Sequence, residues 1–268
     1  MRWLFLLLIV CLFSPQVYSQ LALIESNEKY AIKENVNWIP DVIGNLLFYT
    51  ENELFKAQKG QLPEFSQSIR STGEITQLLP INTFKTILFS ADQQQICFLD
   101  NTFSLNGNCI ELEDYGIQNA KICAISARPN LLYVYDEFNS SLFLIDLVQK
   151  TTTQSVVNVQ ALIGETMNIK SLKEHENNIF LLDKDSTIYV FDMFLNLKGQ
   201  LEEKYSALNF WNGYAVQLSE EKVVFHSLEN KQITLTMECP ASDKLRVHGN
   251  SFYFSRAGAI STYELKSQ

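Results

Sequence analysis

The sequence predicts an all-β protein, a β-propeller with six four-stranded blades, and three observations lead to this fold class. A hairpin pattern, in which an apolar run, a polar turn and a second apolar run follow one another, occurs six times between about Phe48 and Phe254. Its copies recur every 35 to 47 residues, which is the period of a propeller blade. Windows of ordinary helical length with apolar residues at helical spacing are scarce.

The two runs of each hairpin are expected to be the middle strands of a blade. In the best-matched copies, Leu131–Asp136 with Leu142–Asp146 and Ile179–Asp183 with Ile188–Asp192, apolar residues are consecutive and do not alternate with polar ones. Strands that are covered on both faces have this pattern. The middle strands of a blade are covered in this way, because each lies between two neighbouring blades.

Shorter apolar runs before each hairpin predict the inner strands, and weaker, more polar runs after four of the hairpins predict outer strands. The inner strands are expected at Val36–Ile39, Ile75–Leu79, Ile122–Ile125, Ile169–Leu172, Leu208–Phe210 and Leu245–Val247, and the outer strands at Cys109–Leu112, Thr152–Val157, Leu197–Leu201 and Ile233–Met237. One or two helical turns are expected at Asn158–Ile163.

The last hairpin has no outer strand after it, because the sequence given ends at Gln268. An N-terminal segment, Leu21–Ile24 or Tyr30–Ile32, is therefore predicted to complete the last blade and close the ring, which leaves only short, protected edges. Seven blades are the alternative, if the stretch Leu62–Leu79 contains a further degenerate unit.

The start of the chain is typical of a cleaved signal peptide. Arg2 precedes an apolar run, Trp3–Phe13, and Val17-Tyr18-Ser19 ends the segment with residues that a signal peptidase accepts. We expect residues 1–19 to be the signal and residues 20–268 to form a single propeller domain, since no Gly/Ser-rich linker divides the chain. No later stretch reaches about 18 uncharged apolar residues, so a transmembrane segment is not expected. The protein is therefore expected to be secreted into the periplasm or cell envelope.

Composition indicates a packed, acidic protein. Its formal net charge is −9 and 46% of its residues are hydrophobic. No cluster of Lys and Arg is present, which argues against nucleic acid as a partner. A chain of this length can bury a large core as one β domain, and we expect it to be monomeric on its own.

Four cysteines follow the signal segment: Cys97, Cys109, Cys123 and Cys239. An oxidising compartment permits disulfides, but the cysteines are sparse for a disulfide framework. Cys97 and Cys123 lie in apolar runs, where a thiol behaves as a small hydrophobe. The pattern favours four free thiols, with one bridged pair, Cys97–Cys109 or Cys109–Cys123, as the alternative.

Recurrent aspartates at the ends of the runs are expected to cap turns. They are Asp100, Asp146 and Asp192 after second runs, and Asp136 and Asp183 after first runs. An aspartate at the first position of a turn accepts backbone amides further on. Calcium binding is the alternative, but no DxDxDG loop groups these residues.

No motif of catalysis, cofactor binding or metal binding is present. The three histidines, His175, His226 and His248, are far apart in sequence and none lies in an HExxH motif. The sequence also lacks a GxSxG elbow and glycine-rich phosphate loops. We therefore expect no catalytic residues, no metal and no cofactor.

Four aromatic residues are the candidate ligand-binding residues: Trp38, Phe210, Trp211 and Tyr214. They fall at or beside predicted inner or middle strands and would line one mouth of the central channel, where they could stack on a sugar or hold a side chain of a partner. Core filling between the blades explains them as well, and is the favoured interpretation.

Three phrases, Phe84–Phe89, Phe98–Ser104 and Ile188–Phe194, resemble a family of uncharacterised secreted β-propeller proteins of Gram-negative bacteria, of the YVTN/WD40-like superfamily at the level of fold. The resemblance extends over most of the chain after the signal and implies fold and compartment only. The cysteines in and around the second blade depart from the pattern of that family.

The first functional hypothesis is a non-enzymatic module of the cell envelope that binds or assembles an envelope protein partner, because loops vary while packed blades hold them in place. The second is a propeller that binds a glycan or small ligand in its central channel. A propeller hydrolase or lyase is the third.

Overall fold

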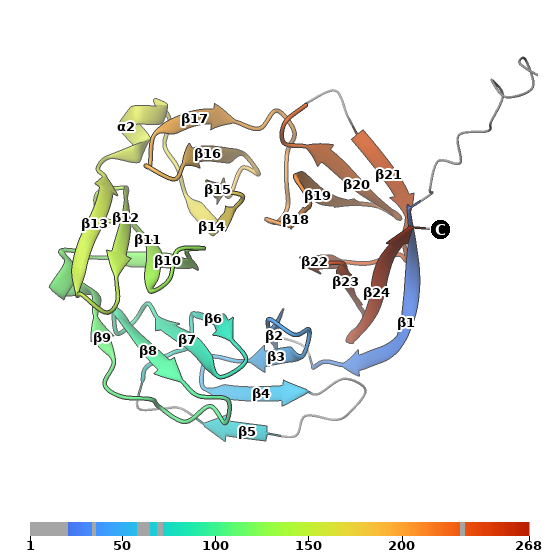
Figure 1. Cartoon of the computed structure of the whole chain (residues 1–268), viewed down its shortest axis with the longest axis horizontal. Helices are drawn as coiled ribbons and strands as arrows, with labels where there is room; N and C mark the ends of the chain where they lie inside the picture. The colour runs from blue at the N-terminus through green and yellow to red at the C-terminus, as the bar shows by residue number, and fades with distance from the viewer. Residues whose placement is uncertain (1–20, 34–35, 58–64, 69–71, 231–233, 268) are drawn as a thin grey trace, which may run out of the picture.

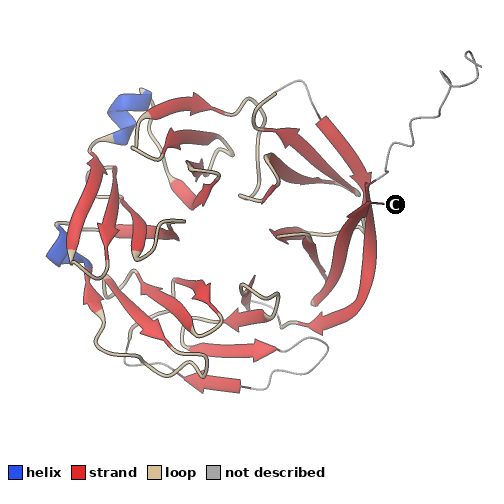
Figure 2. Ribbon diagram, viewed as in Figure 1, coloured by secondary structure: helices blue, strands red, loops and turns tan. Residues whose placement is uncertain are grey.

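Six antiparallel sheets of four strands surround a central axis, as the sequence predicts (Figure 1). The computed structural model describes residues 21–33, 36–57, 65–68, 72–230 and 234–267. The expected signal peptide, residues 1–19, lies outside this part of the chain. Almost every described element is a strand (Figure 2), and the blade count is six.

The strands of each blade run from the axis outward in chain order, except in the last blade. Innermost are β2 (Asn37–Pro40), β6 (Gln77–Asn82), β10 (Ala120–Ile125), β14 (Ile169–His175), β18 (Phe210–Trp211) and β22 (Lys244–His248). Second are β3 (Leu46–Tyr49), β7 (Lys85–Ser90), β11 (Leu131–Asp136), β15 (Asn178–Asp183), β19 (Tyr214–Ser219) and β23 (Ser251–Arg256).

The third strands are β4 (Glu53–Ala57), β8 (Gln95–Leu99), β12 (Ser141–Asp146), β16 (Ile188–Asp192), β20 (Lys222–Ser227) and β24 (Ala259–Ser267). Outermost are β5 (Phe65–Ser68), β9 (Ile110–Glu111), β13 (Thr151–Val156), β17 (Leu197–Gln200), β21 (Thr234–Glu238) and β1 (Leu21–Ala31). We number the blades 1 to 6 from β2 onward, so that β1 belongs to blade 6. A 3-10 turn, η1 (Leu112–Tyr115), and a short helix, α2 (Val159–Ile163), lie at the rim.

The stretch Leu62–Leu79 contains no seventh unit within its described residues. It provides β5, the outer strand of blade 1 that the sequence did not predict, and the start of β6. The predicted helical turn at Asn158–Ile163 is confirmed by α2.

Closure of the ring by the N-terminal segment is confirmed. β1 pairs antiparallel with β24, from Leu21 opposite Ser267 to Ala31 opposite Ala259, with an irregularity between Glu25 and Lys29. The two alternative closing segments are therefore parts of one strand. Figure 1 shows β1, in blue, beside β24, in red.

The hydrophobic core is divided into six clusters, one between each pair of neighbouring blades. The middle strands of blades 3 and 4, such as β11 and β15, are buried along almost their whole length, which confirms their expected cover on both faces, whereas β4, β19 and β20 are only partly buried. Because each blade is sandwiched by its neighbours, every apolar side chain of a middle strand has a packing partner.

One disulfide joins Cys97 to Cys109, so the favoured prediction of four free thiols is wrong. The reason is strand register: β8 and β9 pair with Ile96 opposite Ile110, which places Cys97 and Cys109 across from each other although Cys97 lies in an apolar run. Cys123 and Cys239 are free. Burial raises the pKa of both thiols, that of Cys239 to about 11.

Replacing both bridged cysteines (Cys97→Ala and Cys109→Ala) is expected to lower the free energy of unfolding by about 3 kcal/mol, because the bridge closes a loop of sequence separation 12 and restricts the unfolded chain. Urea unfolding followed by fluorescence measures the change. Cys239→Ala, which removes a partly buried free thiol, is the control with little effect. Equal stability of the double variant and the parent protein would contradict the structural role of this bridge.

A basic cavity in the central channel

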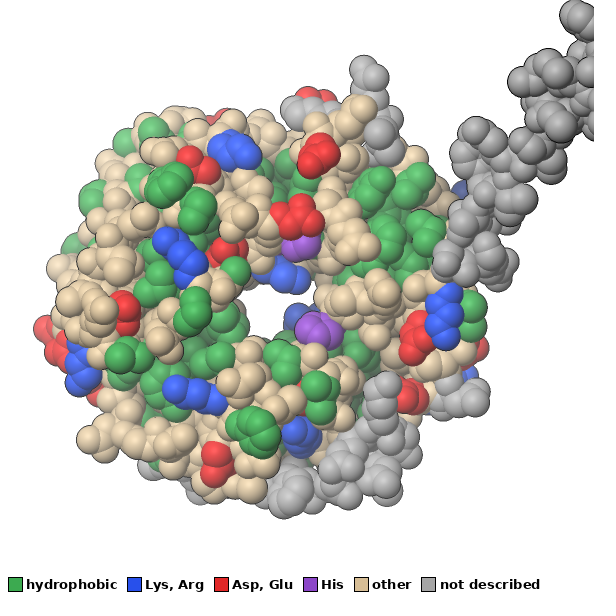
Figure 3. Space-filling model, in the orientation of Figure 1, with side chains coloured by type: hydrophobic (Ala, Val, Ile, Leu, Met, Phe, Trp, Pro, Cys, Tyr) green, Lys and Arg blue, Asp and Glu red, His purple; other side chains and the backbone are tan. Residues whose placement is uncertain are grey.

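The six blades converge on a cavity of about 590 Å³ on the axis. Its walls come from β2, β6, β10, β14 and β22, from Tyr49 at the end of β3, and from the two residues before β18, Leu208 and Asn209. Figure 3 shows the opening through the centre of the disc, with Lys or Arg side chains (blue) and histidines (purple) at its rim. The cavity therefore concentrates positive charge in a protein whose net charge is −9.

Of the four cationic side chains that line this cavity, Lys121, Lys170, Lys173 and Arg246, the last two come from different blades, Lys173 on β14 and Arg246 on β22. Both side chains are partly buried. The Nε atom of Arg246 is buried and has no hydrogen-bond partner in the described part of the chain. No carboxylate of that part stabilises either charge. Unpaired buried charge is costly, so this pair points to an anion-binding function.

The charges in the cavity repel one another. Burial, and secondly the nearby charge of Arg246, lower the pKa of Lys173 to about 8, and the same two causes lower the pKa of Lys244 to about 8. Burial also lowers the pKa of Arg246. Burial raises the pKa of Tyr49, a further residue of the cavity wall, so its hydroxyl remains a hydrogen-bond donor.

Two of the predicted aromatic residues, Trp38 and Phe210, contact the cations of the cavity through their rings. Trp38, 1% exposed, has the guanidinium carbon of Arg246 at 5.3 Å and the Nζ of Lys244 at 5.6 Å from its ring centroid. Phe210 is buried, stacks on His175 at a centroid distance of 4.8 Å and has the Nζ of Lys173 at 5.6 Å. The ring faces hold the cations in place by cation–π attraction.

The other two predicted aromatics lie in the interface between blades 5 and 6. Trp211 and Tyr214 pack against the same hydrophobic cluster and stack on each other, with ring centroids 6.1 Å apart. None of the four aromatics is among the residues that line the cavity, and their positions agree with core filling between blades. Direct contact of these rings with a ligand stays a prediction.

Side-chain amides fix the inner strands that carry the cations. The Nδ2 of Asn209 donates to the carbonyl of Leu245 and its Oδ1 accepts from the amide of Val247, both at 3.1 Å. These two bonds hold β22 on either side of Arg246. On the opposite wall, the Oε1 of Gln77 accepts from the amide of Cys123 at 2.8 Å and joins β6 to β10.

Three other polar or charged groups of the cavity already have partners. Lys121 contacts Glu137 and donates to Asn168. Glu174, the carboxylate among the lining residues, accepts from the amide of Ala127 at 2.9 Å. His248 contacts the carbonyl of Val42 through Nε2 at 3.2 Å. Lys170, a further lining residue, is exposed to solvent, so Lys173 and Arg246 are the partly buried cations of this wall that remain available to a ligand.

The recurrent aspartates cap turns, as predicted. Each carboxylate accepts one or more hydrogen bonds from backbone amides. The donors are Thr102 and Ser104 for Asp100, Val148 and Gln149 for Asp146, Phe194 and Asn196 for Asp192, Phe138 and two others for Asp136, and Thr187 for Asp183. Hydrogen bonds lower the pKa of Asp100 and Asp192.

The described residues form neither a metal-binding cluster nor a membrane-spanning helix. Within those ranges, no three His, Cys, Asp or Glu side chains come together in a way that would hold a metal ion. In the same part of the chain, no helix has both the length and the apolar character needed to cross a membrane.

Sequence reasoning missed Lys173 and Arg246. They are far apart in the chain and form no motif. A signal was nevertheless present, because each is a basic residue in a short inner strand and has an apolar neighbour, Leu172 before Lys173 and Leu245 and Val247 on either side of Arg246.

Comparison with known proteins supports the fold. No protein-family model matches the chain, and no curated protein matches it in sequence. Among solved structures, the WD40 domain of Pan2 from Neurospora crassa is similar with a TM-score of 0.57 and 10% identity, over 92% of this chain and 98% of that one. Virginiamycin B lyase from Staphylococcus aureus has a TM-score of 0.56 and 10% identity, over 94% and 97%. BBS1N, in complex with ARL6DN, has a TM-score of 0.54 and 11% identity, over 83% and 75%. These likenesses show a propeller fold.

Proposed function

We propose that this protein is a non-enzymatic binding module of the cell envelope or periplasm, and that its central cavity takes an anionic group of its partner or ligand. The observation that carries the proposal is the pair of unpaired cations, Lys173 and Arg246, on the wall of one cavity. An anion placed between them would satisfy both charges and remove their mutual repulsion.

Three further observations support this proposal. The disulfide between Cys97 and Cys109 fits an oxidising compartment, in agreement with the signal-like start of the sequence. The single carboxylate of the described lining, Glu174, accepts a backbone amide and so fits a structural role. Among the structural neighbours, BBS1N was solved with a protein partner, ARL6DN.

Inorganic pyrophosphate, as an anionic probe, is expected to bind the purified protein and raise its melting temperature. Lys173→Met and Arg246→Met should each weaken binding at least tenfold, as measured by calorimetric titration. Without the anion, both variants should be more stable than the parent protein, because each removes an unpaired, partly buried charge. Lys222→Met, at an exposed lysine of β20, is the control, and sodium chloride at matched ionic strength separates binding from screening.

Binding should weaken as the pH rises above about 8, because Lys173 then loses its proton in the folded state. The free energy of unfolding of the unliganded protein should instead rise as the pH rises above about 8. In the unfolded chain a lysine keeps its proton up to about pH 10.4, so between about pH 8 and 10 the unfolded state binds more protons and stability rises with pH. A pyrophosphate affinity that does not change with pH and is the same in both variants as in the parent protein would refute the proposal.

A further inference from the structure

Exposed apolar residues occupy the turns between inner and second strands in two neighbouring blades. In blade 1 these are Val42 and Ile43, 37% and 60% exposed, and in blade 2 it is Phe84, 72% exposed. We call these three residues the apolar shelf. The corresponding turns of blades 4, 5 and 6 are polar or glycine-rich, with Glu176-Asn177, Asn212-Gly213 and Gly249-Asn250. A β-turn does not require apolar side chains, so folding does not explain the shelf.

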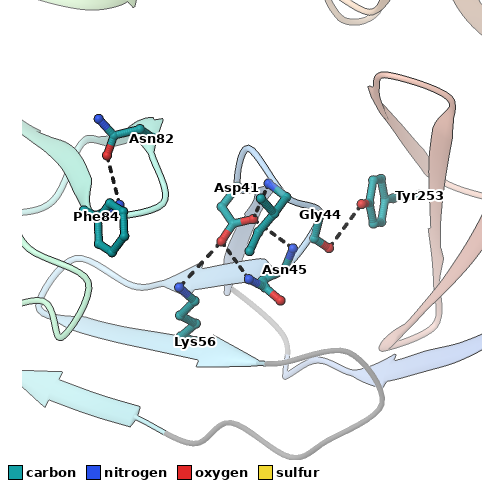
Figure 4. Close-up of polar contacts among 8 residues, drawn as sticks. Asp41, Gly44, Asn45, Lys56, Asn82, Phe84 and Tyr253 are labelled. Atoms are coloured by element: carbon teal, nitrogen blue, oxygen red, sulfur yellow. Dashed lines mark hydrogen bonds and ion pairs between the residues drawn. The ribbon is translucent and has the colours of Figure 1, made fainter.

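Rigid turns hold the apolar shelf (Figure 4). The Oδ1 of Asp41 accepts from the amides of Ile43 at 3.0 Å and Asn45 at 2.9 Å, and its Oδ2 lies 3.6 Å from the Nζ of Lys56. In the next blade, the Oδ1 of Asn82 accepts from the amide of Phe84 at 2.9 Å. These bonds fix the backbone of the two turns, so little backbone entropy is lost when the shelf is covered.

Blade 6 supports the turn of blade 1 from the other side. The hydroxyl of Tyr253 donates to the carbonyl of Gly44 at 3.2 Å, and Nε2 of His248 lies 3.2 Å from the carbonyl of Val42. The turn that carries Ile43 is therefore fixed from two blades.

The apolar shelf continues into the basic cavity. Successive hairpin turns alternate between the two faces of the disc, so all turns between inner and second strands lie at the same mouth of the channel. Pro40 and Pro80, near the two shelf turns, belong to the cavity wall, as does His248. Arg246 precedes His248 by two residues in β22, and Lys173 precedes His175 by two in β14, which places both cations about 7 Å inside this mouth.

We infer that this mouth is the docking site for a protein segment that places apolar side chains on the apolar shelf and an Asp or Glu carboxylate in the cavity, between Lys173 and Arg246. The inference rests on the proposed function and names the class of partner. The residue that the partner places in the cavity is expected to be acidic, because its charge complements those of Lys173 and Arg246. A second copy of this chain does not fit, because a two-fold contact through this face would set one basic mouth against the other.

Selection of a random peptide library displayed on phage against the purified protein tests this inference. We expect the selected peptides to carry at least one Asp or Glu next to apolar residues. Synthetic versions should bind Phe84→Ser and Ile43→Ser at least tenfold more weakly than the parent protein. Changing the acidic residue of a peptide to its amide should weaken binding to the parent protein, but should have little further effect on Arg246→Met.

The matched control is Phe138→Ser. Phe138 is 71% exposed in the turn between β11 and β12, on the opposite face, and its amide donates to Asp136 Oδ1 at 2.9 Å, as the amide of Phe84 does to Asn82. This control variant should bind the peptides normally. Thermal unfolding of all three variants should match the parent protein, because exposed side chains contribute little to stability.

Three results would overturn the docking site: selection of no peptide, selected peptides that bind Phe84→Ser as well as the parent protein, or a dimer in sedimentation that Phe84→Ser dissociates. Pyrophosphate titration distinguishes the two proposals. If pyrophosphate binding depends on Arg246 but the peptides bind Phe84→Ser as tightly as the parent protein, the docking site alone is wrong. If pyrophosphate binding does not depend on Arg246, the proposed anion site is also wrong.

Discussion

A protein that lacks residues 21–31 is expected to lose its cooperative thermal transition and to aggregate. These residues form β1, the outermost strand of blade 6, and their removal exposes the whole edge of β24. The bond from the amide of Ile32 to the carbonyl of Gly258, 2.8 Å long, would be the contact left next to this edge. An open edge of this length is a template for pairing with other chains. Calorimetry and light scattering measure both effects.

A pair of substitutions in β1 separates ring closure from the mere presence of the strand. Tyr30 is 4% exposed and packs between blades 6 and 1 with Trp38, Phe48 and Tyr253, whereas Ile24 is 41% exposed. Tyr30→Ala should lower the free energy of unfolding by about 3 kcal/mol, in the range for large-to-small core substitutions. Ile24→Ala should change it by less than about 0.5 kcal/mol. Similar losses in both variants would mean that β1 acts only through its backbone pairing.

Asp136→Ala is expected to lower the free energy of unfolding by about 4 kcal/mol. This carboxylate is fully buried and accepts three backbone amides, from Gln118 and Asn119 at 3.1 Å and from Phe138 at 2.9 Å. It therefore ties the segment that enters blade 3 to the turn between β11 and β12. Each bond to a charged acceptor contributes about 1.5 kcal/mol, and alanine leaves all three donors without their partner.

Asp192→Ala is the matched control for this second prediction. Asp192 also accepts two amides, from Phe194 at 2.8 Å and Asn196 at 2.9 Å, but these bonds are exposed. Water can replace the lost acceptor there, so a loss of at most about 1 kcal/mol is expected from urea unfolding. If both variants lost the same stability, burial of the Asp136 network would not be the source of its effect.

Much of the fold was predictable because blade structure is a local property. The apolar runs of β11 with β12 and of β15 with β16 are consecutive in sequence and pair within one hairpin, so their pattern could be recognised directly. The missing outer strand after the last hairpin likewise predicted closure by residues near Leu21 or Tyr30. β5 was missed, since an outer strand such as Phe65–Ser68 has no apolar run that marks it.

Other features depend on register and could not be read from spacing. Cys97 and Cys109 form a bridge because β8 and β9 pair with Ile96 opposite Ile110. Asp136 was predicted to cap its own turn, and it does, but its bonds to Gln118 and Asn119 join segments 17 and 18 residues apart.

By itself, the sequence determined the number of blades, the covered middle strands and the strand that closes the ring, because each follows from apolar patterning over a few residues or from a count of repeats. The basic cavity and the apolar shelf were decided by the tertiary structure alone. Lys173 and Arg246 belong to different blades, separated in sequence by more than one repeat. They share a cavity only because closure of the ring brings all six inner strands to one axis.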